Sequence, residues 1–151
     1  MWTVISFLFL VATVYGVSEE YMKQLKFQVA NIAATCIPEV GATEGDVAEL
    51  LSEQPPTTRT GQCLVSCFQK KFGFQDSNGR PDKEGTLALL EPLHDEDIDM
   101  YNKILQIVLV CGPEVQQMPI TDHCDVAMAI GTCAIREGKK YGLNNPFLLN
   151  R

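Results

Sequence analysis

Apolar residues recur at steps of three and four along much of the chain, the spacing that gathers side chains on one face of an α-helix. The first such series comprises Met22, Leu25, Val29, Ile32 and Cys36. No run of the chain shows sustained alternation of apolar and polar residues, which is the pattern of a half-buried strand. The pattern therefore predicts an all-α fold.

Prolines, glycines and capping residues divide the chain into six helical intervals. We expect helices that end before Pro38, run from Thr43 to Pro55, from Thr58 to Phe72, from Pro81 to Glu91, from Asp95 to Gly112, and from Thr121 to Cys133. Thr43 offers a side-chain oxygen for the free N–H groups of the second helix. The sequence Asp76–Gly79 predicts a turn between the third and fourth helices.

The first 17 residues carry no charged side chain, and Val4–Val14 is almost wholly apolar. A membrane anchor is the alternative, but this run is short for a span of about 20 residues and is interrupted by polar side chains. We expect residues 1–16 to be a cleaved signal peptide and residues 17–151 to be one secreted, extracellular domain. The residues after Cys133, 134–151, are expected to form a C-terminal tail that is first basic and then apolar.

Composition narrows the class of protein. A chain of 151 residues with 46% hydrophobic and 21% charged residues is typical of one globular domain. Its net charge of −7 argues against nucleic acid and anionic membranes as partners. Beyond the N-terminus, the apolar run Ile104–Val110 is too short to cross a bilayer, so no stable membrane insertion is expected.

The six cysteines are spaced Cys36-x26-Cys63-x3-Cys67-x43-Cys111-x12-Cys124-x8-Cys133. In a secreted chain they indicate disulfides, and six cysteines allow fifteen pairings. Cys63 and Cys67 lie one helical turn apart with nearly parallel side chains, a poor geometry for bonding each other. Setting that bond aside leaves twelve pairings, in each of which the third helix is tied to two other places.

The x3 and x8 gaps together resemble the pattern of insect odorant-binding proteins of the pheromone- and general-odorant-binding family. The resemblance extends over the whole chain, although the x43 gap is slightly long. It implies a six-helix, disulfide-linked bundle that encloses an apolar cavity. It also implies the bonds Cys36–Cys67, Cys63–Cys124 and Cys111–Cys133.

By the same resemblance, the ligand-binding residues are Leu25, Val29, Ile32, Phe68, Phe72, Phe74, Leu87, Leu90, Ile104, Leu105, Val108, Ala127, Ile130, Phe147 and Leu148. Phe147 and Leu148 would act as a lid, whereas an undocked tail is the alternative. For every other member the alternative is plain core packing, which periodicity does not distinguish from a cavity wall. Ser66, Tyr101 and Tyr141 are candidate hydrogen-bond donors to a ligand.

The implied function is to carry odorants or pheromones, as small hydrophobic ligands, through aqueous extracellular fluid. No catalytic residue, metal or cofactor is expected, because adjacent helical residues such as His123 and Cys124 do not face each other and Arg80 interrupts the calcium-like segment after Asp76. A sensory receptor at a membrane and a second copy of the chain are the protein partners left open. The alternatives are a non-sensory carrier of a hormone or lipid, a helical interaction protein without a cavity, and a small phospholipase.

Overall fold

The computed structural model describes residues 17–52 and 54–143, and within them the chain forms six α-helices. These are α2 (Glu19–Val40), α3 (Glu44–Leu51), α4 (Arg59–Phe72), α5 (Lys83–Glu96), α6 (Ile98–Gln116) and α7 (His123–Lys140). The only β pairing in this part of the chain is an isolated bridge between Gln75 and Pro81. The all-α prediction is confirmed. The predicted signal peptide 1–16 and the predicted lid residues Phe147 and Leu148 lie outside the described residues.

Each helix begins at a residue whose side-chain oxygen accepts a backbone N–H of the first turn, which otherwise has no partner. These N-cap residues are Ser18, Thr43, Thr58, Asp82, Asp97 and Asp122. The expected start at Thr43 is confirmed, and Asp46 completes a capping box there. Local polar residues therefore determine where the helices start.

The predicted helix ends at proline are wrong in three places. Pro38, Pro92 and Pro113 lie inside α2, α5 and α6 instead of ending them. A proline within a helix deprives the carbonyl four residues earlier of its hydrogen bond. Here those carbonyls belong to the exposed residues Ala34, Ala88 and Leu109, where water can replace the lost donor.

The last helix is also longer than expected, since α7 continues seven residues beyond Cys133 to Lys140. Residues 134–140, which we assigned to the tail, are therefore helical. Glu137 is only 5% exposed and accepts hydrogen bonds from Lys140 and Arg136. Those two bonds, Lys140's first, lower the pKa of Glu137. Arg136 in turn binds Glu114 of α6 at 2.6 and 3.0 Å, so the extra turns pack against a neighbour.

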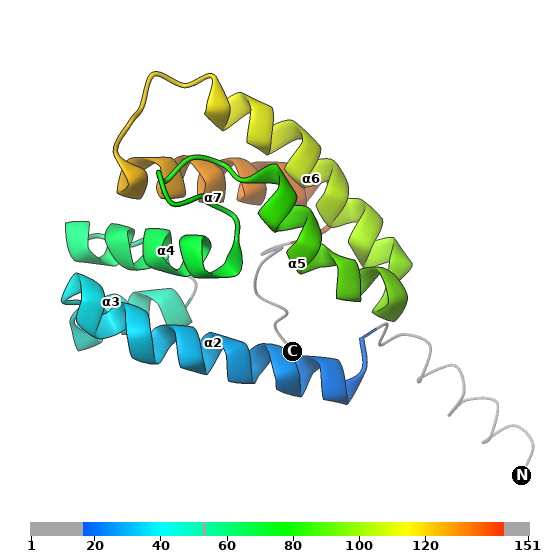
Figure 1. Ribbon diagram of the computed structural model, residues 1–151, viewed down its shortest axis with the longest axis horizontal. Helices are drawn as coiled ribbons and strands as arrows, with labels where there is room; N and C mark the ends of the chain where they lie inside the picture. Colours follow the sequence, from blue (N-terminus) through cyan, green and yellow to red (C-terminus); the bar gives the residue numbers. More distant parts are fainter. Residues whose placement is uncertain (1–16, 53, 144–151) are drawn as a thin grey trace, which may run out of the picture.

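Helix α4 is the centre of the arrangement, because it packs against α7, α2, α3 and α5 (Figure 1). Helix α6 packs against α5 and α7 on the other side of the molecule. Helix α2 is held at both ends: Cys36 near its end is bonded to α4, and the Ser18 N–H at its start donates to Glu96 of α5 at 2.9 Å. Burial, and secondarily Glu96, raises the pKa of Tyr21 at this junction.

Three disulfides connect the helices, as the family resemblance implied: Cys36–Cys67, Cys63–Cys124 and Cys111–Cys133. They tie α2 to α4, α4 to α7, and α6 to α7. Four of the six helices therefore form one covalently linked series.

The hydrophobic core is divided into small parts. Most of the buried apolar residues of the described chain fall into four separate clusters, each with three or four buried members. Five of the fifteen buried hydrophobic residues are disulfide-bonded cysteines. The disulfides thus hold together helices whose apolar contacts alone are limited.

Across residues 17–52 and 54–143, no helix is both long and apolar enough to span a bilayer.

Candidate functional site

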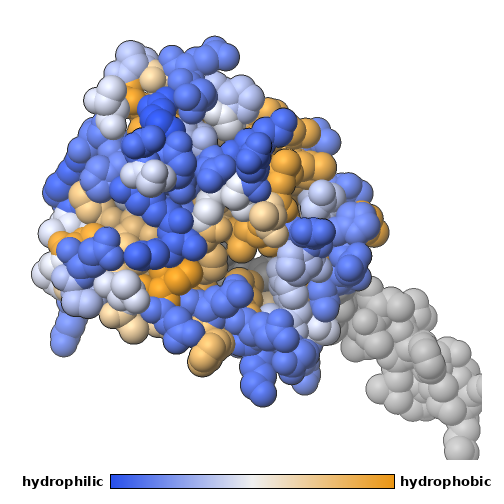
Figure 2. Space-filling model, in the orientation of Figure 1, coloured by the Kyte–Doolittle hydropathy of each residue, from blue (hydrophilic) through white to orange (hydrophobic). Residues whose placement is uncertain are grey.

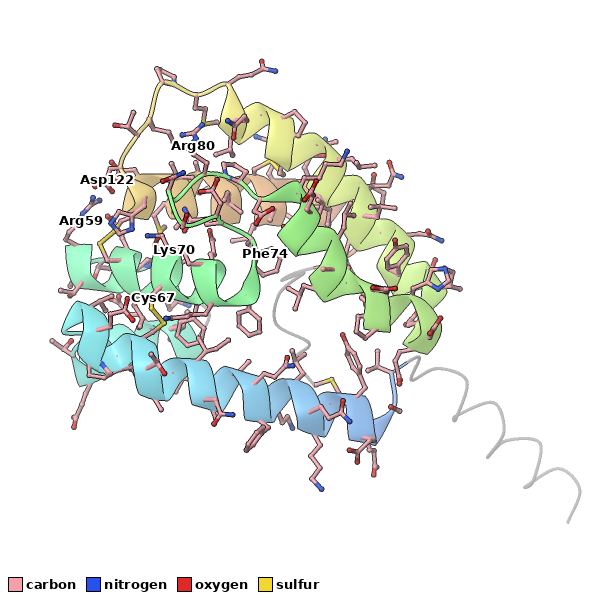
Figure 3. All side chains as sticks on the ribbon, in the orientation of Figure 1. Arg59, Cys67, Lys70, Phe74, Arg80 and Asp122 are labelled. Atoms are coloured by element: carbon pink, nitrogen blue, oxygen red, sulfur yellow. A yellow bond between two sulfur atoms is a disulfide. The ribbon has the colours of Figure 1, made fainter. Side chains whose placement is uncertain are left out.

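A largely apolar pocket of about 450 Å³ lies among α5, α6 and α7 and is partly open to solvent. Helix α6 and its C-cap Gln117 form most of the wall, with residues 107–109, 111–113 and 116–117. The segment 81–83 and Thr86 contribute from the start of α5, and Ile130 and Ala134 contribute from α7. Phe74, from the loop after α4, completes the lining; Figure 3 shows it between α4 and α5. The size and composition suit a small hydrophobic molecule.

Three of the predicted ligand-binding residues line this pocket: Phe74, Val108 and Ile130. Phe74 is positioned by the end of α4, where Gly73 has a φ of 91° and turns the chain. Its N–H then donates to the carbonyl of Gln69 at 2.8 Å. The backbone of the helix end therefore directs this aromatic residue toward α5.

Three of the predicted aromatic residues, Phe68, Phe72 and Phe74, form one connected series. The ring centroids of Phe68 and Phe72 are 6.4 Å apart, and those of Phe72 and Phe74 are also 6.4 Å apart. Phe68 packs against the cluster around the Cys36–Cys67 bond. The series therefore leads from the α2–α4 contact to the pocket.

The remaining predicted residues within 17–52 and 54–143 do not line this pocket. Leu90 and Ile104 are buried together with Leu93, and Ala127 is fully buried. Leu25, Ile32, Leu87 and Leu105 are half-buried. Val29 is 39% exposed. Contact of these residues with a ligand stays a prediction.

Sequence reasoning missed several wall residues, of which Ile107 is the clearest. It is 1% exposed, and it lies three residues after Ile104 and four before Cys111. That spacing places it on the same helical face as both, so the periodicity could have identified it in place of Leu105. Gly112 and Ala134 carry no such signal, because small residues mark a cavity wall only once the opposite helix is known.

Arg80 holds the loop before α5 against the end of α6 (Figure 3). Its guanidinium donates to the carbonyls of Gln116 at 2.9 Å, Val115 at 3.2 Å and Ile120 at 2.5 Å. These carbonyls belong to the end of α6 and the segment after it, where helical partners are missing. Arg80 thereby sets the distance between two segments that form the pocket.

Polar groups around the pocket are mostly engaged in local structure. Asp82 caps α5 by accepting the Gly85 N–H at 2.9 Å, and the Thr86 hydroxyl donates to the Asp82 carbonyl at 2.6 Å. Gln116 and Gln117 are exposed at the rim. The interior surface therefore presents mainly hydrocarbon, and Figure 2 shows further apolar surface exposed over α6, where Leu109 and Val110 are each 44% exposed.

The hydrogen-bond donors suggested by the sequence lie elsewhere. Ser66 is fully buried and donates to Gln75 Oε1 at 2.8 Å, so its hydroxyl proton is already used. Tyr101 is half-buried, with its ring edge-on to His94 at 5.0 Å. Tyr141 is exposed at the end of α7. None of the three is a pocket-lining residue.

A second, smaller hollow of about 310 Å³ lies over the Cys63 and Cys67 side of α4. It is lined by charged residues that include Glu39, Lys70 and Lys71. Lys70 Nζ lies 3.1 Å from His123 Nδ1, and Figure 3 shows Lys70 extending from α4 toward α7. Its polar walls suit water better than an apolar molecule. In the described part of the chain, no three His, Cys, Asp or Glu residues are grouped so as to hold a metal ion.

The fold and the apolar pocket define a class: small helical proteins, cross-linked by disulfides, with an internal surface for hydrophobic molecules. Comparisons with known proteins give the family. The chain matches the PBP/GOBP family over residues 18–137. It is 35% identical to general odorant-binding protein 28a of Drosophila melanogaster over 122 residues, 80% of this chain and 82% of that protein. It is 32% identical to general odorant-binding protein 19d of the same species over 114 residues, 76% of this chain and 74% of that protein.

Comparison with solved structures gives the same family. Odorant-binding protein dmelOBP28a from Drosophila melanogaster matches with a TM-score of 0.62 at 34% identity, covering 80% of this chain and 98% of that one. A pheromone-binding protein from the cockroach Leucophaea maderae, solved with the fluorescent reporter ANS, matches with a TM-score of 0.61 at 24% identity, covering 74% and 92%. The chain belongs to the PBP/GOBP family, which consists of odorant-binding carriers and not of enzymes.

Proposed function

We propose that this protein is a secreted carrier that binds a small hydrophobic ligand, an odorant or pheromone, and transports it through aqueous extracellular fluid. The observation that carries the proposal is the half-open apolar pocket of about 450 Å³ among α5, α6 and α7. Membership of an odorant-binding family supports it. The acidic net charge of −7 suits a protein that stays dissolved at high concentration.

The affinity expected for such a pocket follows from the hydrophobic effect. Burying ten methylene groups yields about 8 kcal/mol before costs are subtracted. Loss of translational freedom and ordering of the ligand remove several kcal/mol, while additional contacts restore some. Dissociation constants around micromolar are therefore expected for neutral molecules with roughly ten carbon atoms.

The direct test is displacement of a fluorescent probe. ANS is a suitable probe, since it is bound in the cockroach relative. We expect medium-chain alcohols, aldehydes, esters and terpenoids to displace ANS from the oxidised protein. Failure of the whole panel to compete, with the three disulfides intact, would contradict the carrier function.

Two helical glycines allow the pocket itself to be tested. A Cβ added at Gly112, in the pocket wall, would meet nothing within 4 Å, and the same holds at Gly131 of α7, outside the lining. Gly112→Leu should fill the pocket and weaken ligand binding at least about tenfold, as a loss of about 1.4 kcal/mol or more. Gly131→Leu is the matched control and should retain the affinity. Both should fold, because leucine favours helix over glycine.

Secretion is part of the proposal and depends on residues 1–16. Expression in insect cells, followed by N-terminal sequencing of protein from the medium, should give a mature chain that starts near Val17. Retention of the chain in the membrane fraction would contradict this.

Among the other functions, a non-sensory carrier of a hormone or lipid would share the pocket, and the tissue that expresses the protein separates this function from odorant transport. Delivery to a receptor and self-association stay predictions.

A further inference from the structure

The pocket among α5, α6 and α7 has a polar end and an apolar end. Its charged and amide-bearing lining residues belong to the start of α5 and the end of α6: Asp82, Lys83, Gln116 and Gln117. Arg80 holds these two ends together, since its guanidinium donates to the Gln116 carbonyl at 2.9 Å. Ile107, another lining residue, lies nine residues before Gln116, about 13 Å along the axis of α6. A molecule that fills the pocket therefore meets hydrocarbon at one end and polar groups at the other.

Lys83 is the only cation among the described residues that line the pocket. Its side chain is exposed, and no carboxylate or other acceptor pairs with its ammonium in the described part of the chain. By contrast, Lys103 and Lys140 each form an ion pair. A lysine side chain can lay its methylene groups along apolar surface while its charged end stays in water. The ammonium of Lys83 is thus free to meet the polar end of a molecule in the pocket.

The position of Lys83 in its helix gives a reason for an anionic partner. It is the first residue of α5, where the helix dipole repels a positive charge. Helix α4 also begins with a cation, Arg59, but that guanidinium is paired with Asp122 and, at 2.6 Å, with Asp125. Among the described residues Lys83 has no such carboxylate, so the carboxylate of a ligand would supply the missing partner.

Asp82 is the other charged residue of the described lining, and it is already engaged. Its carboxylate caps α5 by accepting the Gly85 N–H at 2.9 Å, which directs it toward the first turn of the helix. The net charge of −7 repels anions at long range, but at physiological salt this repulsion is screened over about 8 Å. The charge left for a ligand at the polar end is therefore that of Lys83.

We propose that the pocket binds amphiphilic carboxylates, the class of medium-chain fatty acids, with the hydrocarbon chain toward Ile107 and the carboxylate on the ammonium of Lys83. This inference rests on the proposed carrier function and refines it by naming the head group of the ligand. Neutral molecules of the same length bind through the apolar end alone and gain nothing from Lys83. Lys83 is thereby a specificity-determining residue.

Decanoate and 1-decanol test the proposal, because they share a ten-carbon chain and differ in the charge of the head. Their dissociation constants are measured at neutral pH by displacement of the uncharged fluorescent probe N-phenyl-1-naphthylamine from the oxidised protein. The wild type is compared with Lys83→Met, which keeps the apolar stem and removes the charge. We expect the decanoate constant to rise about 3- to 5-fold in Lys83→Met, and the 1-decanol constant to stay within about twofold.

Two further variants serve as controls. Lys26→Met removes an exposed, unpaired lysine of α2 outside the described lining, so it changes the net charge equally and should leave both constants unchanged. Lys83→Arg keeps the positive charge and should keep the affinity for decanoate. Raising the ionic strength to about 1 M, where the Debye length is about 3 Å, should narrow the difference between the wild type and Lys83→Met for decanoate.

The outcomes separate the two proposals. An unchanged decanoate constant in Lys83→Met, or an equal loss for both ligands, would overturn the role of Lys83 and leave the carrier function intact. A wild type that binds 1-decanol but not decanoate would do the same. Binding of neither ligand by the wild type, together with no displacement by the wider panel, would overturn both proposals.

A measurement on the wild type alone locates the head group. The ¹³Cε resonance of Lys83 should shift with decanoate and stay nearly unchanged with 1-decanol, whereas that of Lys26 should shift with neither. A decanoate-specific shift at another lysine in place of Lys83 would contradict the proposal.

Discussion

Gly79 shows how one residue can depend on a contact far away in the sequence. Its φ is 76°, in the left-handed region that favours glycine. A Cβ placed there would lie 2.3 Å from the Cβ of His123 at the start of α7. The turn after Asp76 therefore approaches α7 as closely as its backbone allows.

Gly79→Ala should lower the free energy of unfolding by about 3 kcal/mol, from backbone strain together with the collision with His123. Gly41→Ala is the control, because Gly41 also has a positive φ of 68° but a Cβ there would meet nothing within 4 Å. It should cost only about 1 kcal/mol. Urea unfolding measures both, and equal effects would contradict the collision.

Asp46 is a second residue with more than a local role. It is 2% exposed and accepts hydrogen bonds from the Thr43 N–H at 2.8 Å, the Thr60 hydroxyl at 2.9 Å and the Thr58 hydroxyl. The Thr43 N–H first, and then the Thr58 hydroxyl, lower the pKa of Asp46 to about 2. Since Thr58 caps α4, this carboxylate joins the starts of two helices.

The lowered pKa gives a pH dependence with a definite sign. An unfolded aspartate has a pKa of about 3.9, so the stabilisation from Asp46 is present above about pH 4 and is lost as pH falls toward 2. The difference in melting temperature between wild type and Asp46→Asn should therefore be constant from pH 7 to 5 and shrink between pH 4 and 2. Glu44→Gln, which removes an exposed carboxylate of the same turn, is the control. A difference that persists at pH 2 would rule out this assignment.

Among the elements, the connection between α6 and α7 depends on a residue outside both. Arg80, in the loop before α5, binds three carbonyls at the end of α6 and in the segment after it. A single side chain thus fastens the loop before α5 to the end of α6 and to the segment that leads to α7.

Arg80→Met keeps the aliphatic stem and removes the guanidinium. It should lower the free energy of unfolding by about 2 kcal/mol, because it leaves part-buried carbonyls without a charged donor. Hydrogen exchange should increase most in the segment 117–121. Lys26→Met, which removes an exposed cation of α2, should change neither quantity. Equal stability of the two variants would show that Arg80 is dispensable.

At the scale of the whole molecule, the disulfides and the divided core belong together. The bonds close sequence separations of 31, 61 and 22 residues. In the entropic account each contributes about 3–4 kcal/mol, which allows the helices to enclose space that a solid core would otherwise fill. The pocket is therefore consistent with the stability of a chain of this size.

Among the three disulfides, Cys63–Cys124 closes the longest loop and should contribute most to the free energy of unfolding. Replacing Cys63 and Cys124 by alanine should therefore lower that free energy about 1 kcal/mol more than replacing Cys111 and Cys133, whose bond closes a shorter loop. Guanidinium unfolding of the two double variants gives the comparison. A larger loss from the Cys111–Cys133 pair would mean that contacts around α6, and not loop closure, dominate.

The sequence alone determined the six helical intervals and the start of the second helix at Thr43, because these follow from local periodicity and from a capping side-chain oxygen. The disulfide pairing came from the family resemblance, since the spacing of the six cysteines by itself left twelve pairings. It also predicted Phe74, Val108 and Ile130 as residues near a ligand, and these line the pocket. It placed three helix ends wrongly at prolines, since the cost of an internal proline depends on whether water reaches the freed carbonyl.

Only the tertiary structure decided which buried faces meet packed side chains and which meet open space. Periodicity reports that a residue turns inward, but it contains no information about the helix opposite. Leu90 and Ile104 are buried in a cluster with Leu93, whereas Ile107 and Ala134, which are buried as well, border the pocket. Likewise, only the packing of α7 beside α4 brings the Gln69 side chain to the Ala127 carbonyl, to which its Nε2 donates at 3.0 Å.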